Sequence, residues 1–534
     1  MDPEEDGSNE TSGLLNSSKE EILNEADLYE KTVSSCGFGK FQVFLLLICG
    51  WALASDSVEI QVVSFVLPSA CDLHMTSSEK GWLNAIIFVG MICGGYTFGG
   101  VADIKGRRFV LLWSMTINGI FGLASAFSPY FILFLFLRFL SGIGVGGAMP
   151  VLFSYFVEFM PKARRGPMIG FMASFWMFGN ILTSLVAWLI IPHIEIGGYI
   201  LDLWFGSWRI FVALGAFPSL SAAMLLIILP ESPKYLQKVG KDAEATDVFT
   251  RMFHANNGCD KPVPIEIKEF SEAYYKSLSV NAEEDDDDTY VADPESCICS
   301  NFLGSCVHTL AQVFNSTKQL FKPPLLLPTV ILLFVWFTLS FGYYGLWMWF
   351  PEIFKRIQHG GSSCGGGVSV NYTVPNMTCL QTVASESETY VESFFVALAN
   401  LPGNIFVIIA INKVGRRAIL AVAMVLSGVT VFFFWLVTNR LEMIIMSCIF
   451  SGISVAGWNA LDALALENYP THLRSTAFGL QATVGRVAAI LGNVVFGQLV
   501  DIHCSVPLLL VASLLGAGGL LAFKLPRTDK SSLD

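Results

Sequence analysis

The sequence carries ionisable side chains inside long apolar runs, where a charge needs a reason. Asp56 and Glu59 lie three residues apart in the first run, and therefore on one face of a helix. Asp462 and Arg486 lie in two later runs. A charge in the middle of a bilayer costs at least ~2.5–3.5 kcal/mol on insertion scales, so each one indicates a function or a buried partner. Two neighbouring carboxylates resist ionising together, which would suit a proton-binding site.

A static network of buried ion pairs is the alternative interpretation of these charges. Asp56 with Arg138, or Asp462 with Arg486, are examples of such pairs. Arg138 lies near the start of its run, so its side chain could instead extend to the membrane surface. The sequence alone leaves these alternatives open.

Aromatic residues lie well inside the same runs and predict a cavity lining: Trp176, Trp336, Tyr343, Tyr344 and Trp458. Trp458 and Asp462 are four residues apart and share a helix face. Indole rings beside a carboxylate accommodate a flat ring, a sugar face or an organic cation. Aromatic residues are also common in membrane proteins at the interfaces, so a purely structural role is the alternative.

The apolar runs that carry these residues set the fold class. Of the 534 residues 53% are hydrophobic and only 14% are charged, whereas a soluble domain carries about a quarter of charged residues. A membrane span needs roughly 20 mostly apolar residues. Such runs lie at 41–68, 82–101, 109–128, 131–157, 168–191, 209–229, 326–350, 391–411, 418–437, 442–466, 475–498 and 504–524. They predict an all-α membrane protein of twelve transmembrane helices.

The sequence has no motif that indicates catalysis, metal binding or nucleotide binding. The twelve cysteines have no metal-ligand spacing, and Gly144-x-Gly146-Gly147 lies inside an apolar run, outside the strand–turn–helix context of a nucleotide loop. We therefore expect no enzyme, no metal or cofactor site and no nucleic-acid partner. The expected partners are the lipid bilayer and a small-molecule solute.

An internal repeat divides the chain into two halves. Gly106-Arg107-Arg108 recurs as Gly415-Arg416-Arg417, and Glu158-x-x-Pro161-x-x-x-Arg165 recurs as Glu467-x-x-Pro470-x-x-x-Arg474, both 309 residues later. Parallel six-helix halves are typical of transporters whose halves rock about a central site. We expect a disordered tail at 1–35, a first half at 36–230, a partly disordered central loop at 231–325, a second half at 326–525 and a tail at 526–534.

Charged residues of the repeat indicate a conformational role at its loops. Asp103 precedes Arg107 and Arg108 at a tight turn, and a carboxylate there can pair with an arginine of a neighbouring helix. Such an ionic latch would hold one conformer and break in the other. Positive charge that only directs membrane insertion is the alternative. The second copy has Asn412-Lys413 and no carboxylate, so the halves need not be equivalent.

Basic residues in short links predict which side faces the cytosol. They accumulate in the repeat loops and after the last run, whereas the link at 128–130 has no Lys or Arg. Both termini and the central loop are thus expected in the cytosol. The link at 351–390 then lies outside, with glycosylation sequons at Asn371 and Asn376, and with Cys364 and Cys379, which form a disulfide or stay free thiols.

Four motifs resemble the signatures of the major facilitator superfamily, in its sugar and organic-ion porter branch. They are Gly99-x-x-x-Asp103-x-x-Gly106-Arg107-Arg108, Arg138-x-x-x-Gly142-x-Gly144-x-Gly146-Gly147, Glu158 through Arg165-Gly166, and Pro230-Glu231-Ser232-Pro233-Lys234-Tyr235-Leu236. From about Cys36 to Pro526 the chain is most similar to the synaptic vesicle glycoprotein 2 family, for example at Trp458-Asn459-Ala460-Leu461-Asp462. That family has a long folded insert between spans 7 and 8, where this chain has about 40 residues.

The resemblance implies a transporter fold whose tryptophans line a central ligand cavity, in a synaptic-type vesicle or the plasma membrane. Glu10-Thr11-Ser12-Gly13-Leu14-Leu15 fits an acidic dileucine signal for trafficking adaptors, with Glu10, Leu14 and Leu15 as its key residues. The leading hypothesis is a secondary transporter of a small polar or charged organic solute, with proton coupling as an option. The rival is a non-transporting vesicle-membrane protein that binds a ligand.

Overall fold

The structure is a computed structural model that describes residues 28–193, 197–200, 203–268, 270, 317–358, 387–437, 439–503 and 505–526. Within these ranges twelve helical segments are long and apolar enough to cross a membrane. The predicted all-α, twelve-helix membrane fold is confirmed.

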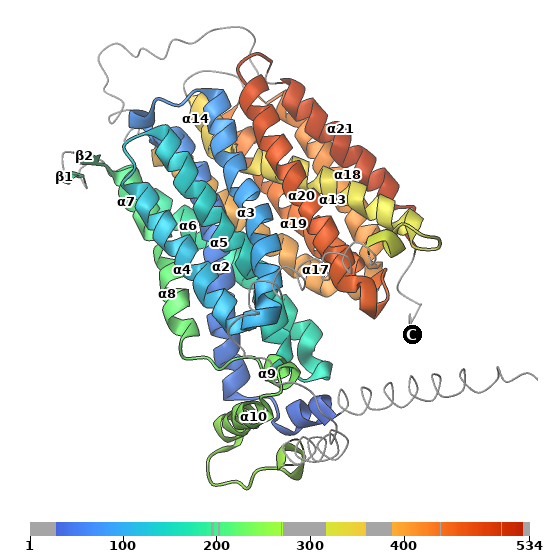
Figure 1. The fold of residues 1–534 in the computed structure, drawn as a ribbon. Helices are drawn as coiled ribbons and strands as arrows, with labels where there is room; N and C mark the ends of the chain where they lie inside the picture. Colours follow the sequence, from blue (N-terminus) through green and yellow to red (C-terminus); the bar gives the residue numbers. More distant parts are fainter. Residues whose placement is uncertain are drawn as a thin grey trace, which may run out of the picture.

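Six spanning segments form each half of the molecule (Figure 1). The first half consists of α2 (Lys40–Ser69), α3 (Ser77–Lys105), α4 (Arg107–Ala126), α5 (Phe131–Glu158), α6 (Arg165–Ile190) and the pair α7 (Ser207–Gly215) and α8 (Phe217–Leu226). The second half consists of α13 (Leu326–Trp347), the pair α16 (Ser387–Leu398) and α17 (Asn400–Val414), α18 (Arg416–Phe434), α19 (Arg440–Glu467), α20 (Thr471–Leu499) and α21 (Ser505–Ala522).

Two predicted spans are each divided into two consecutive helices, and a proline explains both breaks. Pro218 lies in the first turn of α8, and Pro402 lies in the first turn of α17. Proline has no N–H to donate to the preceding turn, so it is tolerated where a helix begins and interrupts a helix that it enters later. The sequence periodicity predicts one apolar run at each place and does not resolve the break.

Short elements lie at the two ends of the bundle. The helices α9 (Pro233–Lys238) and α10 (Asp242–Asn257) lie beneath the first half, and α14 (Phe350–Gln358) lies at the opposite end (Figure 1). We call these the α10 end and the α14 end. The 3-10 turn η2 (Lys162–Arg164) precedes α6, η1 (Cys71–Leu73) follows α2, and the antiparallel strands β1 (Gly198–Ile200) and β2 (Leu203–Phe205) form a small hairpin before α7, which the sequence did not predict.

Residues 28–35, within the segment expected to be a disordered tail, form a helix that packs on the α10 end. Tyr29 and Val33 are buried in a cluster with Phe249 of α10. The Tyr29 hydroxyl donates a hydrogen bond to the Glu158 carbonyl oxygen (2.7 Å). Residues four positions apart share a helix face, so this short segment buries an apolar side and is folded there. Residues 1–27 lie outside the described ranges.

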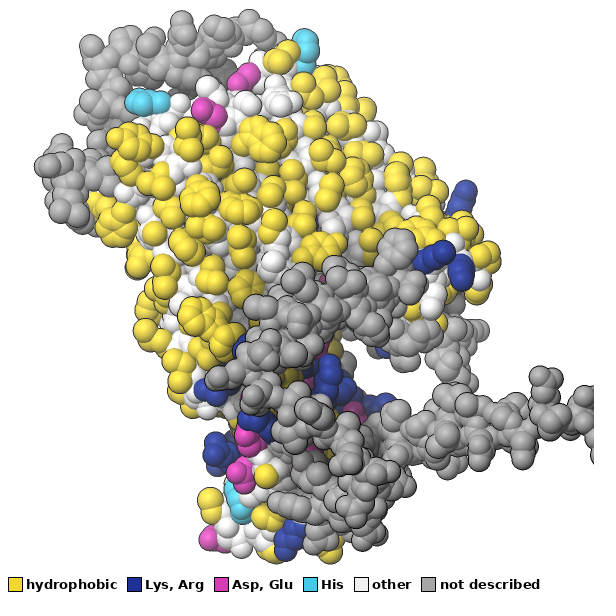
Figure 2. All heavy atoms as spheres, in the orientation of Figure 1, with side chains coloured by type: hydrophobic (Ala, Val, Ile, Leu, Met, Phe, Trp, Pro, Cys, Tyr) yellow, Lys and Arg dark blue, Asp and Glu magenta, His cyan; other side chains and the backbone are white. Residues whose placement is uncertain are grey.

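The surface of the body between the two ends is mainly apolar. Figure 2 shows hydrophobic side chains over the visible face of the bundle, with charged side chains gathered toward the α10 end and a few at the opposite end. Exposed side chains there include Met224, Leu327 and Ile408. A large contiguous apolar surface is unusual for a soluble protein and is the surface that lipid chains cover.

The repeated glycine turns have a backbone reason. Gly106 and Gly415 join the second and third spans of each half with φ angles of 99° and 89°. A residue with a Cβ atom rarely adopts these values. At Gly106 an added Cβ would also lie 2.4 Å from a carboxylate oxygen of Glu231. Both copies of the repeat thus use glycine to reverse the chain within one residue.

Candidate functional site

A cluster of aromatic rings on α13 and α19 extends from the second half to the first. The Trp336 and Trp458 ring centroids are 5.4 Å apart, and Tyr343 stacks on Trp347 at 5.5 Å. Trp347 in turn lies 6.2 Å from Trp176 of α6, which belongs to the first half. The cluster therefore joins α13 and α19 of the second half to a helix of the first, and it includes the tryptophans that the sequence singled out.

Tyr344 extends the cluster toward α3. Its ring lies 5.9 Å from Trp458 and 5.0 Å from Phe88 of the first half. Three polar atoms of the cluster, the indole nitrogens of Trp336 and Trp458 and the hydroxyl oxygen of Tyr343, are buried without a hydrogen-bond partner among the described residues. Buried polar groups are normally paired, so these atoms are available to a molecule that enters the interface.

Asp56 of α2 is buried close to this interface, with 1% of its surface exposed. Neither carboxylate oxygen has a hydrogen-bond partner among the described residues. The charge of Arg486, on α20 of the second half, acts on it across the interface. Arg486 itself donates a hydrogen bond to the Met91 carbonyl oxygen of α3 (3.0 Å). Asp56 thus faces an opposite charge without a direct ion pair, an arrangement that a proton or a bound cation would stabilise.

Glu59 lies in a different environment from Asp56. Its carboxylate forms an ion pair with Arg138, which is fully buried, and accepts a hydrogen bond from Ser141. The Ser141 hydroxyl oxygen also lies 2.8 Å from the Asn118 amide oxygen, and the Asn118 amide nitrogen donates to Ser219 (2.8 Å). This network joins α2, α4, α5 and α8 inside the first half. Glu59 is therefore a structural partner of Arg138, and the arginine does not extend to the membrane surface.

The predicted example pairs differ from the observed one. Within the described residues, neither Asp56 with Arg138 nor Asp462 with Arg486 forms an ion pair, and Arg138 pairs with Glu59 instead. The reason is the direction of the helices: α5 starts at the α14 end, so Arg138 in its second turn reaches the level of Glu59 rather than that of Asp56. Asp462 is half-buried, one turn beyond Trp458, and its charge acts on Tyr344.

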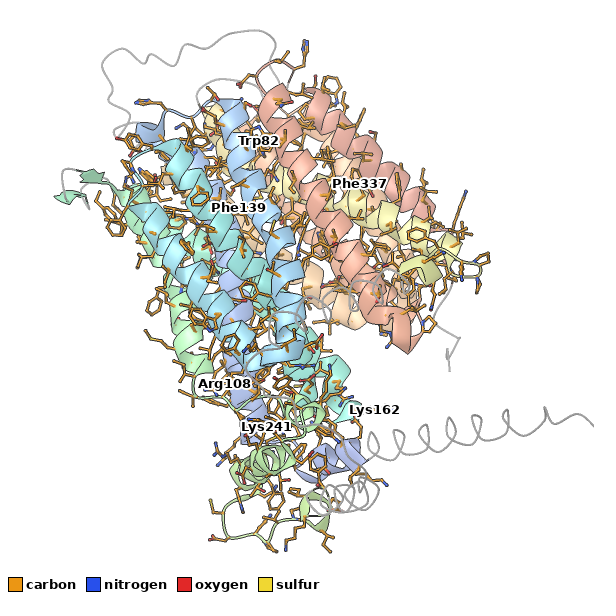
Figure 3. All side chains as sticks on the ribbon, in the orientation of Figure 1. Trp82, Arg108, Phe139, Lys162, Lys241 and Phe337 are labelled. Atoms are coloured by element: carbon orange, nitrogen blue, oxygen red, sulfur yellow. The ribbon has the colours of Figure 1, made fainter. Side chains whose placement is uncertain are left out.

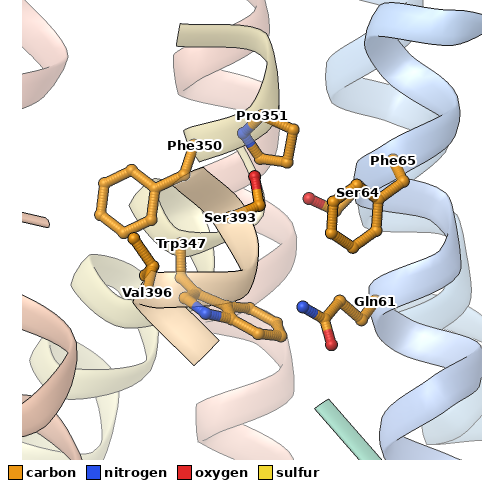
Figure 4. A pocket seen from close by; sticks show the side chains of 8 residues that line it. All are labelled: Gln61, Ser64, Phe65, Trp347, Phe350, Pro351, Ser393 and Val396. Atoms are coloured by element: carbon orange, nitrogen blue, oxygen red, sulfur yellow. The ribbon is translucent and has the colours of Figure 1, made fainter. Parts of the chain in front are cut away.

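A small hollow lies between the halves on the α14 side of the aromatic cluster (Figure 4). Gln61 extends from α2 toward Trp347 across it. The Gln61 amide nitrogen donates to Ser184 (2.9 Å), whereas its oxygen has no partner among the described residues. The other lining residues are Ser64, Phe65, Phe350, Pro351, Ser393 and Val396. The hollow is too small for an organic solute in this conformer.

The arginines of the repeat form ion pairs within each half. Arg107 lies 3.4 Å from Glu158 and 3.5 Å from the more exposed Asp103. In the second copy, Arg416 lies 2.9 Å from Glu467. The predicted latch partners therefore hold neighbouring helices of one half together in this conformer and do not join the two halves.

The remaining arginines of the repeat have backbone or local partners. The Arg108 side chain donates to the carbonyl oxygens of Leu226 (3.3 Å) and Ile227 (2.5 Å), and Arg417 donates to that of Leu525 (2.8 Å). Arg165 forms an ion pair with Glu30 (2.6 Å), and Arg474 donates to the Tyr469 carbonyl oxygen (3.5 Å). They fasten loops and helix ends within their own half.

Hydrogen bonds and ion pairs between the halves lie elsewhere. Those that join described residues of the two halves lie in the middle of the bundle or toward the α14 end. They include Met91–Arg486, Ser64–Met348, Pro68–Lys355, Ser77–Arg356, Ser77–Asp501 and Lys80–Glu352. The halves are therefore closed against each other at the α14 end in this conformer.

Several predicted residues cannot be placed. Asn371, Asn376, Glu10, Leu14, Leu15, Cys364 and Cys379 lie outside the described residues. The structure does show that Cys71, at the α14 end, is disulfide-bonded. The sequence analysis did not single out Cys71.

Sequence reasoning also missed a group of charged residues at the α14 end: Lys80, Glu352, Arg356 and Asp501. Glu352 and Arg356 are four residues apart directly after the seventh span, a spacing that predicts an ion pair on a helix. That signal was available. The pairing of Glu352 with Lys80, 272 residues away, was not.

Comparisons with known proteins identify a matching family and similar relatives. The model of the Major Facilitator Superfamily matches residues 47–382 and 362–533. Human synaptic vesicle glycoprotein 2C is 32% identical, with 94% of this chain and 81% of that protein covered. Mouse synaptic vesicle glycoprotein 2B is 31% identical, with 99% and 90% covered.

Solved structures resemble the chain in fold. A partially occluded inward open conformation of the xylose transporter XylE from E. coli has a TM-score of 0.65 at 16% identity, with 91% of this chain and 100% of that chain covered. A crystal structure of a D-xylose–proton symporter has a TM-score of 0.62 at 17% identity, with 92% and 100% covered. At these identities the likeness supports the fold alone.

Proposed function

Because this chain belongs to the major facilitator superfamily, and within it to the synaptic vesicle glycoprotein 2 family, we propose that it is a secondary transporter. The solute is a small polar or charged organic molecule, which crosses the membrane by alternating access. The chain is a multi-pass membrane protein of the transporter type and not an enzyme. Its two halves would rock about the interface that holds the aromatic cluster.

The observation that carries the proposal is the set of unpaired polar atoms at that interface. Asp56 contributes both carboxylate oxygens, and Trp336, Trp458 and Tyr343 contribute donors. Burying polar groups without partners is costly, so these atoms are better explained as contacts for a guest than as parts of a static core. Flat aromatic walls with a carboxylate suit a sugar ring or an organic cation.

Proton coupling is the finer part of the proposal and rests on Asp56. The carboxylate has no hydrogen-bond donor, and its counter-charge, Arg486, belongs to the opposite half. When the halves move, the distance between the two charges changes, and a proton can replace Arg486 as the partner of Asp56. Glu59 does not share this role, because Arg138 and Ser141 already bind it.

The α10 end would face the cytosol, with both termini and the central link. Arg108, Lys162 and Lys241 lie toward this end (Figure 3), in agreement with the bias of basic residues to the cytosolic side. The link with Asn371 and Asn376 would then face a lumen or the exterior and be glycosylated. The named relatives are synaptic vesicle glycoproteins, so a vesicle membrane is the proposed location, reached through trafficking adaptors that recognise the N-terminal tail.

The test is uptake of labelled solutes into proteoliposomes, with and without a pH gradient. Wild type should accumulate at least one sugar or organic cation, and the variants Asp56→Asn and Asp462→Asn should lose most of that uptake. The lipid-facing variant Trp113→Ala, at an exposed position of α4, should retain it. If a broad set of sugars and organic ions gives no uptake by folded wild type, the transporter proposal fails.

A ligand-binding protein that does not transport is the second candidate. The halves are closed against each other at the α14 end. If they never separate there, a solute can bind between the halves but cannot cross the membrane. Binding of a solute by folded protein, together with no uptake in either direction, would identify this function instead. Binding and uptake should therefore be measured on the same preparation.

A further inference from the structure

Four charged side chains at the α14 end form a connected cluster that includes both halves: Lys80, Glu352, Arg356 and Asp501. Lys80 of α3 lies 2.8 Å from Glu352 of α14, and the side chains are 16% and 5% exposed. Lys80 comes from the first half and Glu352 follows the first span of the second. We call this group the α14-end cluster.

Arg356 ties the cluster together. Its guanidinium donates to Ser77 of α3 (2.9 Å), to Glu352 (3.2 Å) and to Asp501 after α20 (2.8 Å). The neighbouring Lys355 donates to the Pro68 carbonyl oxygen at the end of α2 (2.8 Å). The short helix α14 thus attaches the ends of α2 and α3 to the end of α20.

Electrostatics at the cluster favours the charged forms. Burial raises the pKa of Glu352, but the adjacent charges of Lys80 and Arg356 outweigh burial and hold that pKa below its ordinary value. Burial also raises the pKa of Asp501, but hydrogen bonds from Ser77 and Arg356 and the charge of Arg356 outweigh burial, so this pKa too lies below its ordinary value. Lys355 adds further positive charge near Glu352. Both carboxylates therefore stay ionised and bonded while the halves are together.

The α10 end is built differently. Its ion pairs, such as Arg107 with Glu158 and Arg416 with Glu467, join helices of the same half. Among the described residues, the ion pair that joins the two halves is Lys80–Glu352 of the α14-end cluster. A bond that exists in one arrangement of the halves and breaks in the other is what biases a two-state equilibrium.

We propose that the α14-end cluster is a latch that holds the α14 end shut, with Glu352 as its central residue. Opening toward that side breaks the Lys80–Glu352 ion pair and the Arg356–Ser77 hydrogen bond. This inference rests on the proposed rocking of the halves and not on transport or on any solute. It goes beyond the central site, from which the latch is separate.

The test measures the distance between the halves at this end by double electron–electron resonance in lipid nanodiscs. Spin labels are attached through Tyr130→Cys, in the link before α5, and Leu441→Cys, in the first turn of α19; both positions are exposed. Other cysteines that react with the label are replaced. Wild type should give mainly the short distance of the closed conformer. Glu352→Gln should increase the population at longer distances about tenfold, equivalent to about 1.4 kcal/mol.

The matched control is Glu392→Gln. Glu392 is also a buried carboxylate at the α14 end, but its arginine partner, Arg440, belongs to the same half. This control should keep the wild-type distance distribution. If Glu352→Gln and Glu392→Gln give the same distribution, whether both shift or neither does, the latch is refuted.

A second variant keeps the test decisive if Glu352→Gln does not fold. Lys80→Met removes the other partner and should shift the distances in the same direction. In the double variant Lys80→Met/Glu352→Gln the shift should be no greater than the larger single shift, because all three variants lose the Lys80–Glu352 ion pair that joins the halves. Shifts that add in the double variant, or a Lys80→Met protein that stays closed, would contradict the proposal. A proteoliposome screen without uptake would leave it standing.

Discussion

Replacing Glu59 by glutamine should destabilise the first half strongly, because it leaves the Arg138 charge without its partner. Arg138 is fully buried and Glu59 is 1% exposed. Breaking a buried ion pair on one side costs about 3–5 kcal/mol, since the remaining charge has no compensation. An exposed pair contributes far less, because water screens it and both side chains are mobile. The expected loss for Glu59→Gln is therefore about 3–5 kcal/mol in the free energy of unfolding.

The hydrogen bonds around Glu59 and Arg138 determine how large the loss in the free energy of unfolding is. Two Arg138 guanidinium nitrogens already lack a partner among the described residues, so the arginine cannot recover its lost bond from another group in the same position. Ser141 keeps Asn118 as a partner when the carboxylate is removed. The loss should therefore fall mostly on Arg138, and Arg138→Met should restore part of the stability to the Glu59→Gln protein.

The assay is equilibrium unfolding in mixed micelles with increasing SDS, followed by tryptophan fluorescence. The four proteins are wild type, Glu59→Gln, Arg138→Met and the double variant, and Lys241→Gln is the control at an exposed pair. The double variant should be more stable than Glu59→Gln alone. A double variant whose loss equals the sum of the two single losses would refute the account of this pair.

Three further predictions concern turns, thiols and pH. Gly106→Ala should destabilise the protein by about 1–3 kcal/mol, because its φ of 99° and ψ of 158° lie in a region that is nearly restricted to glycine. Gly170→Ala, at an open helical position, should not destabilise it; equal effects of the two substitutions in SDS unfolding would contradict this. Burial raises the pKa of the Cys36 thiol to about 12, and only the thiolate reacts with iodoacetamide. At about pH 8 the reagent should therefore modify the exposed Cys259 at least about tenfold faster than the buried Cys36. Equal modification rates of the two cysteines, measured by mass spectrometry, would contradict this prediction. Since the pKa of Glu352 is lowered from 4.5, its contribution to the closed α14 end is complete above 4.5 and is lost as the pH falls through the lowered pKa. Spin-label distances should therefore be unchanged at about pH 5, and opening there would contradict the latch.

Periodic and local signals predicted the fold well. Apolar run length located all twelve spans, because the bilayer thickness fixes how many residues a span needs. The repeated Gly-Arg-Arg turn found the two halves, since Gly106 and Gly415 each need a backbone conformation that only glycine adopts readily. The helical breaks near Pro218 and Pro402 were not resolved, because a run of apolar residues looks the same on both sides of a break.

Pairing across the structure was the part that the sequence could not supply. The aromatic cluster could be anticipated because Trp336, Trp458 and Trp176 lie inside spans that face one another in the resembled family. Which carboxylate pairs with Arg138 depends on the relative height of α2 and α5, and a one-turn offset decides between Asp56 and Glu59. Likewise, nothing local to Lys80 predicts that it meets a carboxylate from the other half.

The measurement that tests the central claim most directly is ligand-induced thermal stabilisation of the purified protein across a set of sugars and organic cations. A solute at 100 times its dissociation constant stabilises the folded state by about 2.7 kcal/mol, which raises the melting temperature measurably. If the solute binds between the halves, Asp56→Asn and Trp458→Ala should abolish the shift, and the lipid-facing Trp113→Ala should keep it. A shift that survives in both Asp56→Asn and Trp458→Ala would place the site elsewhere and contradict the account.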